Sequence, residues 1–255
     1  MAASKKKPPV ARFEDAPSLS SKDFLAFEKH KWSDSDCNAE RLLLKRKLAA
    51  IGAPIHSHLA AAGADLTLRT SIHNPFKFNG NRVDSLWLYF APSDAAKKPL
   101  RDLLGVEFES DTDASYVHAN LVLEVDFHGV NMGLRVHERA WWDVANAKRR
   151  CGERAGAEEF ARRLNEVRGG YSLRLHDWKQ EYRCGALKWD DLLGYFRYCE
   201  PGQHRMLVWK TLKKDDPRLF DPSFVATVAD EFASFLPVYD WLLWSPQNNH
   251  LLGSR

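Results

Sequence analysis

The sequence predicts an α+β fold, in which an antiparallel-rich sheet has helices packed on one face and is flanked by N- and C-terminal helices. Two observations predict it. The first is the alternating segment SYVHANLVLEVDFHGVNMGLRVHERAWW at 115–142, which is typical of a β-hairpin. The second is that helical patterns precede and follow the strand-like runs, which favours α+β over a repeating strand–helix order.

Composition indicates one large domain after a short tail. The chain has 255 residues, is 44% hydrophobic and contains nine Trp and fourteen Phe, which is enough for a sizeable core. Residues 1–18 contain KKKPP and scattered Pro and Ser, so we expect a flexible basic tail there. Residues 19–255 are then expected to form a single α+β domain.

The overall charge excludes a strong global attraction to nucleic acid. Lys and Arg number 37 against 34 Asp and Glu, a net charge of +3, so polyanion binding would have to be local. The sequence has no run of about 18 consecutive apolar residues and no apolar stretch after its basic N-terminus. We therefore expect no membrane association and a cytoplasmic location.

The N-terminal third predicts helices followed by two strands. Ser20 or Ser21 is expected to begin the first helix; a second runs from about Asp36 to Gly52, and Pro54 opens a short third helix. Strands are expected over 65–73 and 82–92, with the second covered on both faces because nearly every residue is apolar. A short helix over 94–104 follows.

The loop between these strands, HNPFKFNGN, contains Asn-Pro and Asn-Gly, both of which favour turns. One interpretation is that it only connects the strands as an extended hairpin. The other is that it lines a ligand pocket with His73, Asn74, Asn79 and Asn81.

The hairpin at 115–142 predicts a definite register. With His128-Gly129 as a two-residue turn, residues whose numbers sum to 257 pair, so that Phe127 lies opposite Val130 and Val125 opposite Met132. All pairs on that face are apolar, and a shift by one residue would destroy the segregation. The opposite face is expected to be polar.

That polar face is the candidate catalytic site. Glu124 and Asp126 project the same way, and Arg135 lies diagonal to Glu124. Two carboxylates near imidazoles suit acid–base catalysis or a hard divalent cation, but a solvated sheet face looks the same. The candidate catalytic residues are Glu124, Asp126, His118, His137 and Arg135.

The C-terminal half mixes helices and strands. Helices are expected at 139–152, 157–170 and 189–200, and strands at 171–178, 181–187 and 205–212. A closing helix pair broken at Pro237 is expected over 221–244. The segment HDWKQEYR, 176–183, mixes aromatic and basic side chains as nucleic-acid surfaces do, and also as half-buried surfaces do.

Cofactor motifs are not found in the sequence. It contains no GxSxG, GxxxxGK[ST], HExxH or strand-linked GxGxxG pattern, and it lacks the lysine of a restriction-type nuclease strand. The four cysteines form no CxxC pair, which favours free thiols over a disulfide framework. A zinc site from His176, Cys184, Cys199 and His204 would lack the usual close spacing, so no metal and no cofactor are expected.

The order of elements in residues 20–140 resembles a known group. A helix pair, KLAAIGAPIHSHL, a strand, a turn carrying Asn-Pro, the strand SLWLYF and a hairpin are similar to the YktB-like group of uncharacterised bacterial proteins. That group has a His/Arg-rich stretch before paired prolines, whereas SIHNPFKFNGN has one proline. The resemblance implies a bacterial α+β protein and no particular activity.

The leading functional hypothesis is a binding or interaction protein, with nucleic acid or a partner protein as ligand. It depends on local basic clusters and the missing catalytic motifs. The candidate contacts are Lys5, Lys6, Lys7, Lys45, Arg46, Arg149 and Arg150. The alternative is a metal-assisted hydrolase that uses Glu124 and Asp126 with His118 or His137 as proton carrier; the sequence does not decide whether the protein is an enzyme.

Overall fold

The computed structural model describes residues 11–104 and 118–251, and the predicted α+β fold is confirmed there. Seven α-helices surround a seven-stranded antiparallel sheet within these ranges. The helices are α1 (Ser21–Leu25), α2 (Asn38–Ala61), α3 (Asp94–Leu104), α5 (Trp141–Cys151), α6 (Arg154–Asn165), α7 (Trp189–Tyr198) and α8 (Phe224–Leu242). The strands are β1 (Leu66–Thr70), β2 (Ser85–Pro92), β3 (Asn120–Asp126), β4 (Gly129–Val136), β5 (Ser172–Leu175), β6 (Tyr182–Arg183) and β7 (Met206–Lys213).

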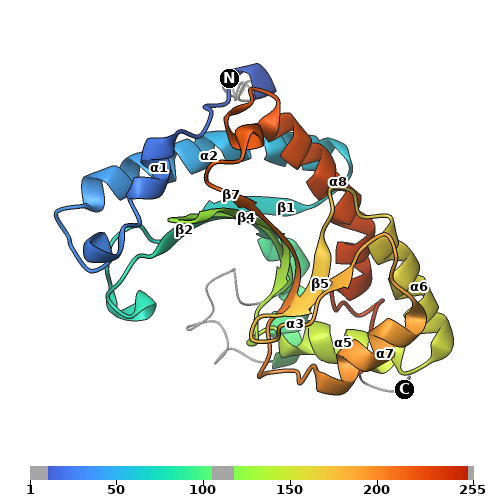
Figure 1. The fold of residues 1–255 in the computed structure, drawn as a ribbon. Coiled ribbons are helices and arrows are strands. Elements are labelled where there is room, and N and C mark those ends of the chain that lie inside the picture. Colours follow the sequence, from blue (N-terminus) through green and yellow to red (C-terminus); the bar gives the residue numbers. More distant parts are fainter. Residues whose placement is uncertain (1–10, 105–117, 252–255) are drawn as a thin grey trace, which may run out of the picture.

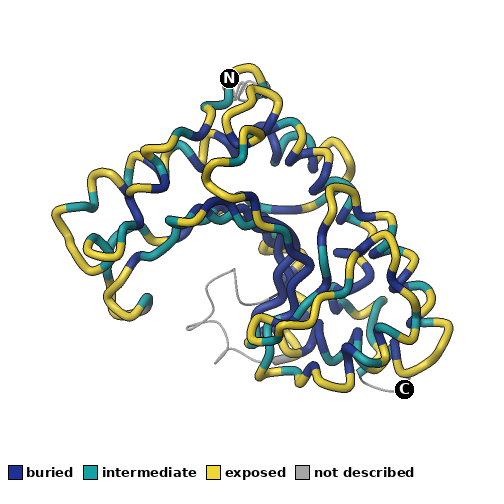
Figure 2. The backbone as a smooth tube through the Cα atoms, in the orientation of Figure 1, coloured by how far each residue is buried: buried dark blue, intermediate teal, exposed yellow. Residues whose placement is uncertain are grey.

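The sheet is curved, with the order β1-β2-β3-β4-β7-β5-β6. In Figure 1 it forms an arch, with α2 and α8 on the outside and α5, α6 and α7 grouped beside its β5 end. The central strands are the most deeply buried part of the chain (Figure 2). The sheet thus has a convex face, on which helices form the main core, and a concave face.

Apolar side chains on the convex face explain the helix packing. Phe90 of β2 contacts the rings of His56 in α2 and Phe232 in α8, at centroid distances of 6.4 and 6.0 Å. The ring of Phe160 in α6 stacks on Trp241 of α8 at 4.3 Å. These contacts join all helix layers into one core, because burial of apolar surface is the main favourable term in folding.

The β3–β4 hairpin has the predicted faces but not the predicted register. Val125 pairs with Val130 and Leu123 with Met132, so paired numbers sum to 255 and the strands are displaced by two residues. Asp126 explains the difference, because its Oδ1 accepts the backbone N–H groups of His128 and Gly129 at 2.6 and 3.0 Å. The turn therefore consists of Phe127 and His128, and a two-residue displacement keeps every side chain on its face.

The predicted break between helices at Gly52 and Pro54 is wrong, because α2 runs unbroken through both. The side chain of Leu68 from β1 packs against Gly52, and its Cδ1 would lie 2.6 Å from a Cβ at that position. Gly52 is therefore a site of close packing, and tertiary contacts outweigh the unfavourable helix propensity of Gly and Pro.

The predicted break at Pro237 is also wrong, since α8 continues to Leu242. The carbonyl oxygen of Pro237 accepts a hydrogen bond from Arg163 Nη1 at 2.9 Å. Residues near both ends of the described chain, Phe13 and Leu251, pack against this core. The ring of Phe13 lies 5.9 Å from that of His58 in α2, so within the expected tail 1–18 the residues from Phe13 onward contact the domain; residues 1–10 lie outside the described ranges.

Among the described helices, no segment has both the length and the apolar character needed to cross a bilayer.

Candidate functional site

The concave face of the sheet is the candidate site. The register places on it the odd-numbered residues of β1, β2, β4 and β7 and the even-numbered residues of β3 and β5. Its apolar part is a second small cluster, separate from the main core, formed by Tyr89, Ala91, Val122, Leu207 and Trp209 with Trp87 packed against it.

An ion pair lies beside this aromatic cluster. Arg135 Nη1 lies 3.6 Å from Glu124 Oε2, so the predicted proximity of these two residues is confirmed. The guanidinium of Arg135 also lies over the ring of Trp87, at 5.4 Å from its centroid. Gly133 separates the two residues along the face and has no side chain, which leaves room for Arg135 to extend towards Glu124.

Burial shifts the pKa of Glu124. It raises the pKa of this carboxyl group above the ordinary 4.5, and the charge of Asp126 acts in the same direction. Arg135 and a hydrogen bond from Ser85 oppose the rise by stabilising the carboxylate. A desolvated carboxyl group next to a stacked guanidinium is typical of functional sites, and also occurs in structural ion pairs.

The concave face carries two buried hydrogen-bond donors that lack acceptors among the described residues. These are Trp87 Nε1 and Arg174 Nε, although Arg174 Nη1 donates to Glu181 Oε1 at 3.2 Å. Arg69, Arg183 and Lys213 add exposed cations from β1, β6 and β7. Because unsatisfied donors and cations seek acceptors, this face suits an acceptor-rich, anionic ligand.

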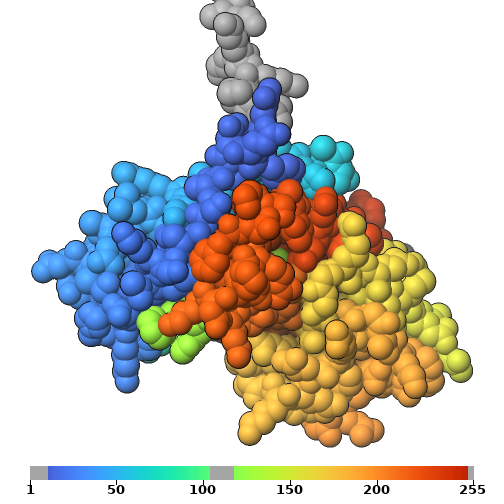
Figure 3. Space-filling model, turned by 45° about the horizontal axis from the view of Figure 1, so that its top comes forward, coloured from blue at the N-terminus to red at the C-terminus, as the bar shows by residue number. Residues whose placement is uncertain are grey.

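Asp126, although on this face, has a structural role at the turn. Besides the two backbone N–H groups, its Oδ2 accepts a hydrogen bond from Asn131 Nδ2 at 2.8 Å. In Figure 3 the hairpin tip, in yellow-green, reaches the surface between the blue N-terminal segment and the orange segment that follows β7. There Lys214 Nζ lies 4.0 Å from the centroid of the Phe127 ring.

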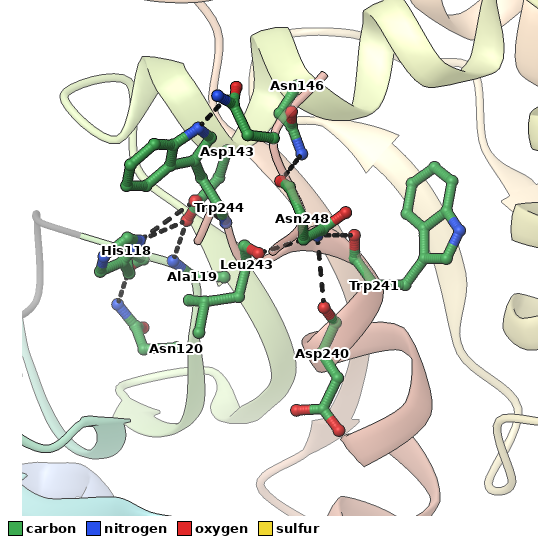
Figure 4. Close-up of polar contacts among 11 residues, drawn as sticks. His118, Ala119, Asn120, Asp143, Asn146, Asp240, Trp241, Leu243, Trp244 and Asn248 are labelled. Carbon is green, nitrogen blue, oxygen red and sulfur yellow. Dashed lines mark hydrogen bonds and ion pairs between the residues drawn. The ribbon is translucent and has the colours of Figure 1, made fainter. Parts of the chain in front are cut away.

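His118 belongs to a different environment. Its Nδ1 lies 3.1 and 3.2 Å from the two carboxylate oxygens of Asp143, both residues being fully buried. Asp143 also accepts the backbone N–H groups of Ala119 at 2.9 Å and Trp244 at 2.8 Å (Figure 4). This carboxylate thus holds the start of β3, α5 and the chain after α8 together, which is a structural task.

His137 lies in a third environment, after the end of β4. Its Nδ1 accepts the backbone N–H of Arg139 at 3.2 Å, and its Nε2 lies 3.3 Å from Glu138 Oε2. Arg205 Nε binds the same carboxylate oxygen at 2.6 Å. The five residues predicted as catalytic therefore have four different sets of partners: Glu124 pairs with Arg135, Asp126 binds the turn, His118 binds Asp143 and His137 lies beside Glu138. The charge of Arg135 also acts on His137.

The Asn-rich loop closes on itself. Asn79 Oδ1 accepts the backbone N–H of Phe76 at 2.8 Å, and its Nδ2 donates to the carbonyl of Asn74 at 3.0 Å. Asn81 adopts a left-handed backbone with φ of 57°. This geometry favours the interpretation as a connection, while His73 lies near Lys45 and Arg46, whose charges, after burial, lower its pKa.

The basic candidates do not form one surface. Lys45 and Arg46 lie on α2, whereas Arg149 and Arg150 lie on α5 at the other end of the arch (Figure 1). Arg150 is bound to Glu159 at 2.6 Å and covers the ring of Trp241 at 4.4 Å, so it serves the core. Lys5, Lys6 and Lys7 lie outside the described residues.

The cysteines are free thiols in the described residues, as expected. Burial raises the pKa of Cys151, Cys184 and Cys199 to about 12, which keeps these thiols protonated. Within residues 11–104 and 118–251, no group of three His, Cys, Asp or Glu side chains is placed to hold a metal ion.

Sequence reasoning missed the aromatic part of the face. The strand SLWLYF is predicted to be covered on both faces, and the burial of residues 88–92 confirms this. The prediction did not specify that Trp87 and Tyr89 share the concave face. The usable signal is the period of two, which places Trp87 and Tyr89 on one face and Leu86, Leu88 and Phe90 on the other.

No protein-family model and no curated protein matches the chain. The resemblance of residues 20–140 to the YktB-like group therefore stays a prediction.

Proposed function

We propose that the protein binds single-stranded nucleic acid along the concave face of its sheet. The observation that carries the proposal is the half-exposed ring of Trp87 beside the Arg135 guanidinium, together with donors that lack acceptors among the described residues. The other two rings of this face, Tyr89 and Trp209, are buried and support Trp87 from below. Single strands are bound by such surfaces, because bases stack on aromatic or guanidinium planes and phosphates accept hydrogen bonds from cations.

The distribution of charge supports this choice. The cations Arg69, Arg183 and Lys213 lie on strands at or near both sides of the face, and Trp87 lies between them on β2. Glu124 is partly neutralised by Arg135. A strand crossing the sheet would meet a cation on each side of the central aromatic residues, which is a sequence-independent way to bind a polyanion.

The test is fluorescence anisotropy of a labelled oligothymidylate at increasing salt. We expect Trp87→Ala to weaken binding about fivefold to 160-fold, since one base–aromatic stack contributes about 1–3 kcal/mol. Removing Arg69, Arg183 and Lys213 together should make the slope of log K against log salt less steep by about 2. Arg162→Ala is the matched control, because Arg162 is exposed on α6 and pairs with Glu166.

Absence of binding even at low salt would refute the proposal, as would an equal loss in the Arg162→Ala control. A face that captures a protein and no oligonucleotide would also refute it. The metal-assisted hydrolase receives no support from the described residues, because Glu124, Asp126, His118 and His137 do not converge on one point.

A further inference from the structure

A small cavity lies on the opposite side of the sheet from the concave face, where α2 and α8 end. Its volume is about 270 Å³, and its walls come from the residues that follow α2, the start of β1, the end of β2, α3 and the last turns of α8 with the residue after it. Most of the lining is apolar and small, including Ala62, Leu66, Pro92 and Leu236. The polar lining side chains are those of Asp65, Tyr239 and Asp240.

Tyr239 contributes a hydroxyl group that the described residues do not satisfy. The residue is 3% exposed, and its Oη has no hydrogen-bond partner among them. A buried hydroxyl group without a partner costs free energy, so its presence in a cavity wall indicates that something else completes its hydrogen bonding. Water or a ligand in the cavity would do so.

The charges around the cavity favour a cation. The carboxylate of Asp65 has one oxygen engaged, since its Oδ2 accepts the hydroxyl proton of Ser93 at 2.6 Å. The carboxylate of Asp240 points away from the network of Asn248, which binds the backbone carbonyl of Asp240 instead (Figure 4). Asp240 is exposed as a residue, yet partial desolvation of its carboxyl group raises its pKa, while Arg163 opposes the rise.

The helix ends add to this negative potential. Both α2, which ends at Ala61, and α8, which ends at Leu242, direct their C-terminal ends to this region. The C-terminal end of a helix carries a partial negative charge that stabilises cations. Arg163, the nearest counter-charge, is already bound by Glu159 at 2.8 Å.

We propose that this cavity binds a small organic cation of the alkylammonium class. Its carbon atoms contact Ala62, Leu66 and Leu236, and its ammonium group donates to the carboxylates of Asp65 and Asp240 and to Tyr239 Oη. The volume lies just below the range of about 300–1,000 Å³ that holds drug-sized ligands, so a ligand of a few heavy atoms fits. This site is independent of the proposed nucleic-acid face.

The test is a titration of ¹⁵N-labelled full-length protein followed by amide chemical shifts. The probes are n-butylammonium chloride, uncharged n-butanol and sodium butyrate at constant ionic strength. We expect saturable shifts at Gly63, Ala64 and Leu243 with butylammonium, and affinities at least about tenfold lower for the other two probes.

Variants assign the contacts. Asp240→Asn and Asp65→Asn should each weaken butylammonium binding about tenfold, and Tyr239→Phe, which removes only the hydroxyl group, should weaken it several-fold. Asp215→Asn is the control, because Asp215 is exposed after β7 and outside the cavity lining. The two carboxylates of the site are at the surface, so these substitutions leave the core intact; thermal unfolding checks this.

The proposal is overturned if butylammonium gives no saturable shifts, or if butanol binds equally well, which would show an apolar cavity only. It is also overturned if Asp215→Asn weakens binding as much as Asp240→Asn and Asp65→Asn do, since the effect would then be general electrostatic attraction.

Discussion

At the scale of single residues, some buried polar groups beside the sheet have partners and others do not. On the convex face Lys210 Nζ lies 2.6 Å from both carboxylate oxygens of Glu231, and Tyr171 Oη donates to the same group at 2.7 Å. These three side chains satisfy one another. On the concave face Trp87 Nε1 and Arg174 Nε keep unmatched donors among the described residues. Since unpaired buried groups are costly, evolution tolerates them mainly where they serve binding.

His137 gives a prediction for pH. Burial lowers its pKa from 6.5 to about 4; Glu138 opposes this, while Arg205, Arg135 and Arg139 add to it. In the unfolded chain, His137 therefore binds a proton below about pH 6.5, whereas in the folded chain it binds this proton only near pH 4. The stability contribution is complete above pH 6.5 and is lost progressively as the pH falls towards 4.

The measurement is a comparison of wild type with His137→Gln. We expect the free energy of unfolding of the wild type, minus that of the variant, to fall by up to about 2 kcal/mol as the pH is lowered from 6.5 to 5. Imidazole carbon shifts in NMR spectra of the wild type should report a neutral His137 throughout this range. A midpoint near 6.5 for His137 would contradict the prediction.

At the scale of elements, local sequence patterns predicted which face of the sheet each side chain lies on. They did not predict the lengths of the helices or the registers of the strands. Alternation placed Leu121, Leu123 and Val125 on the core side correctly, because a strand has a fixed period of two. The register depended on Asp126 capping its own turn, and on β7, whose Leu212 carbonyl would lie 2.0 Å from a Cβ at Gly129. Gly129 is therefore required both by the neighbouring strand and by its own backbone, which has a φ of 153°.

Helix continuity was unpredictable for a similar reason. Gly52, Pro54 and Pro237 are local signals that end or kink an isolated helix. Their helices continue because each packs along its length against the rest of the core, an interaction between segments far apart in the sequence. The aromatic half of the candidate site was not predicted for the same reason, since only the sheet order brings Trp87 and Trp209 onto one face.

Substitutions at two glycines test how much the close packing of β4 against β7 contributes to stability. At Gly133, with φ of 144°, a Cβ would lie 2.0 Å from the carbonyl oxygen of Val208 in β7. At Gly80, with φ of 64°, a Cβ would meet nothing within 4 Å. We expect Gly133→Ala to separate β4 from β7 and to cost more than about 3 kcal/mol, whereas Gly80→Ala costs only about 1–2 kcal/mol for its left-handed backbone.

Urea unfolding followed by circular dichroism measures both glycine variants. Equal losses of unfolding free energy in the two variants would show that β4 and β7 can separate locally without destabilising the whole sheet. That result would contradict the prediction, which depends on the central position of this strand pair.

At the scale of the whole molecule, α8 joins the two halves of the chain. It packs against α2 from the N-terminal half and against α5 and α6 from the C-terminal half. The sheet does the same, since β7 lies between β4 and β5. Within the described residues, the buried apolar side chains outside the concave cluster form one continuous core. Neither half of the chain therefore buries its apolar surface without the other.

This connection predicts cooperative unfolding of the full chain. Ile55 in α2 and Phe160 in α6 are both fully buried but lie in different halves. Replacing either by Ala removes buried carbon atoms and should cost about 2–5 kcal/mol. Because both residues belong to one core, each variant should shift a single transition, with coincident midpoints by tryptophan fluorescence and by far-ultraviolet circular dichroism. Two separate transitions, with Phe160→Ala moving only one of them, would show that the halves fold independently and that α8 does not couple them.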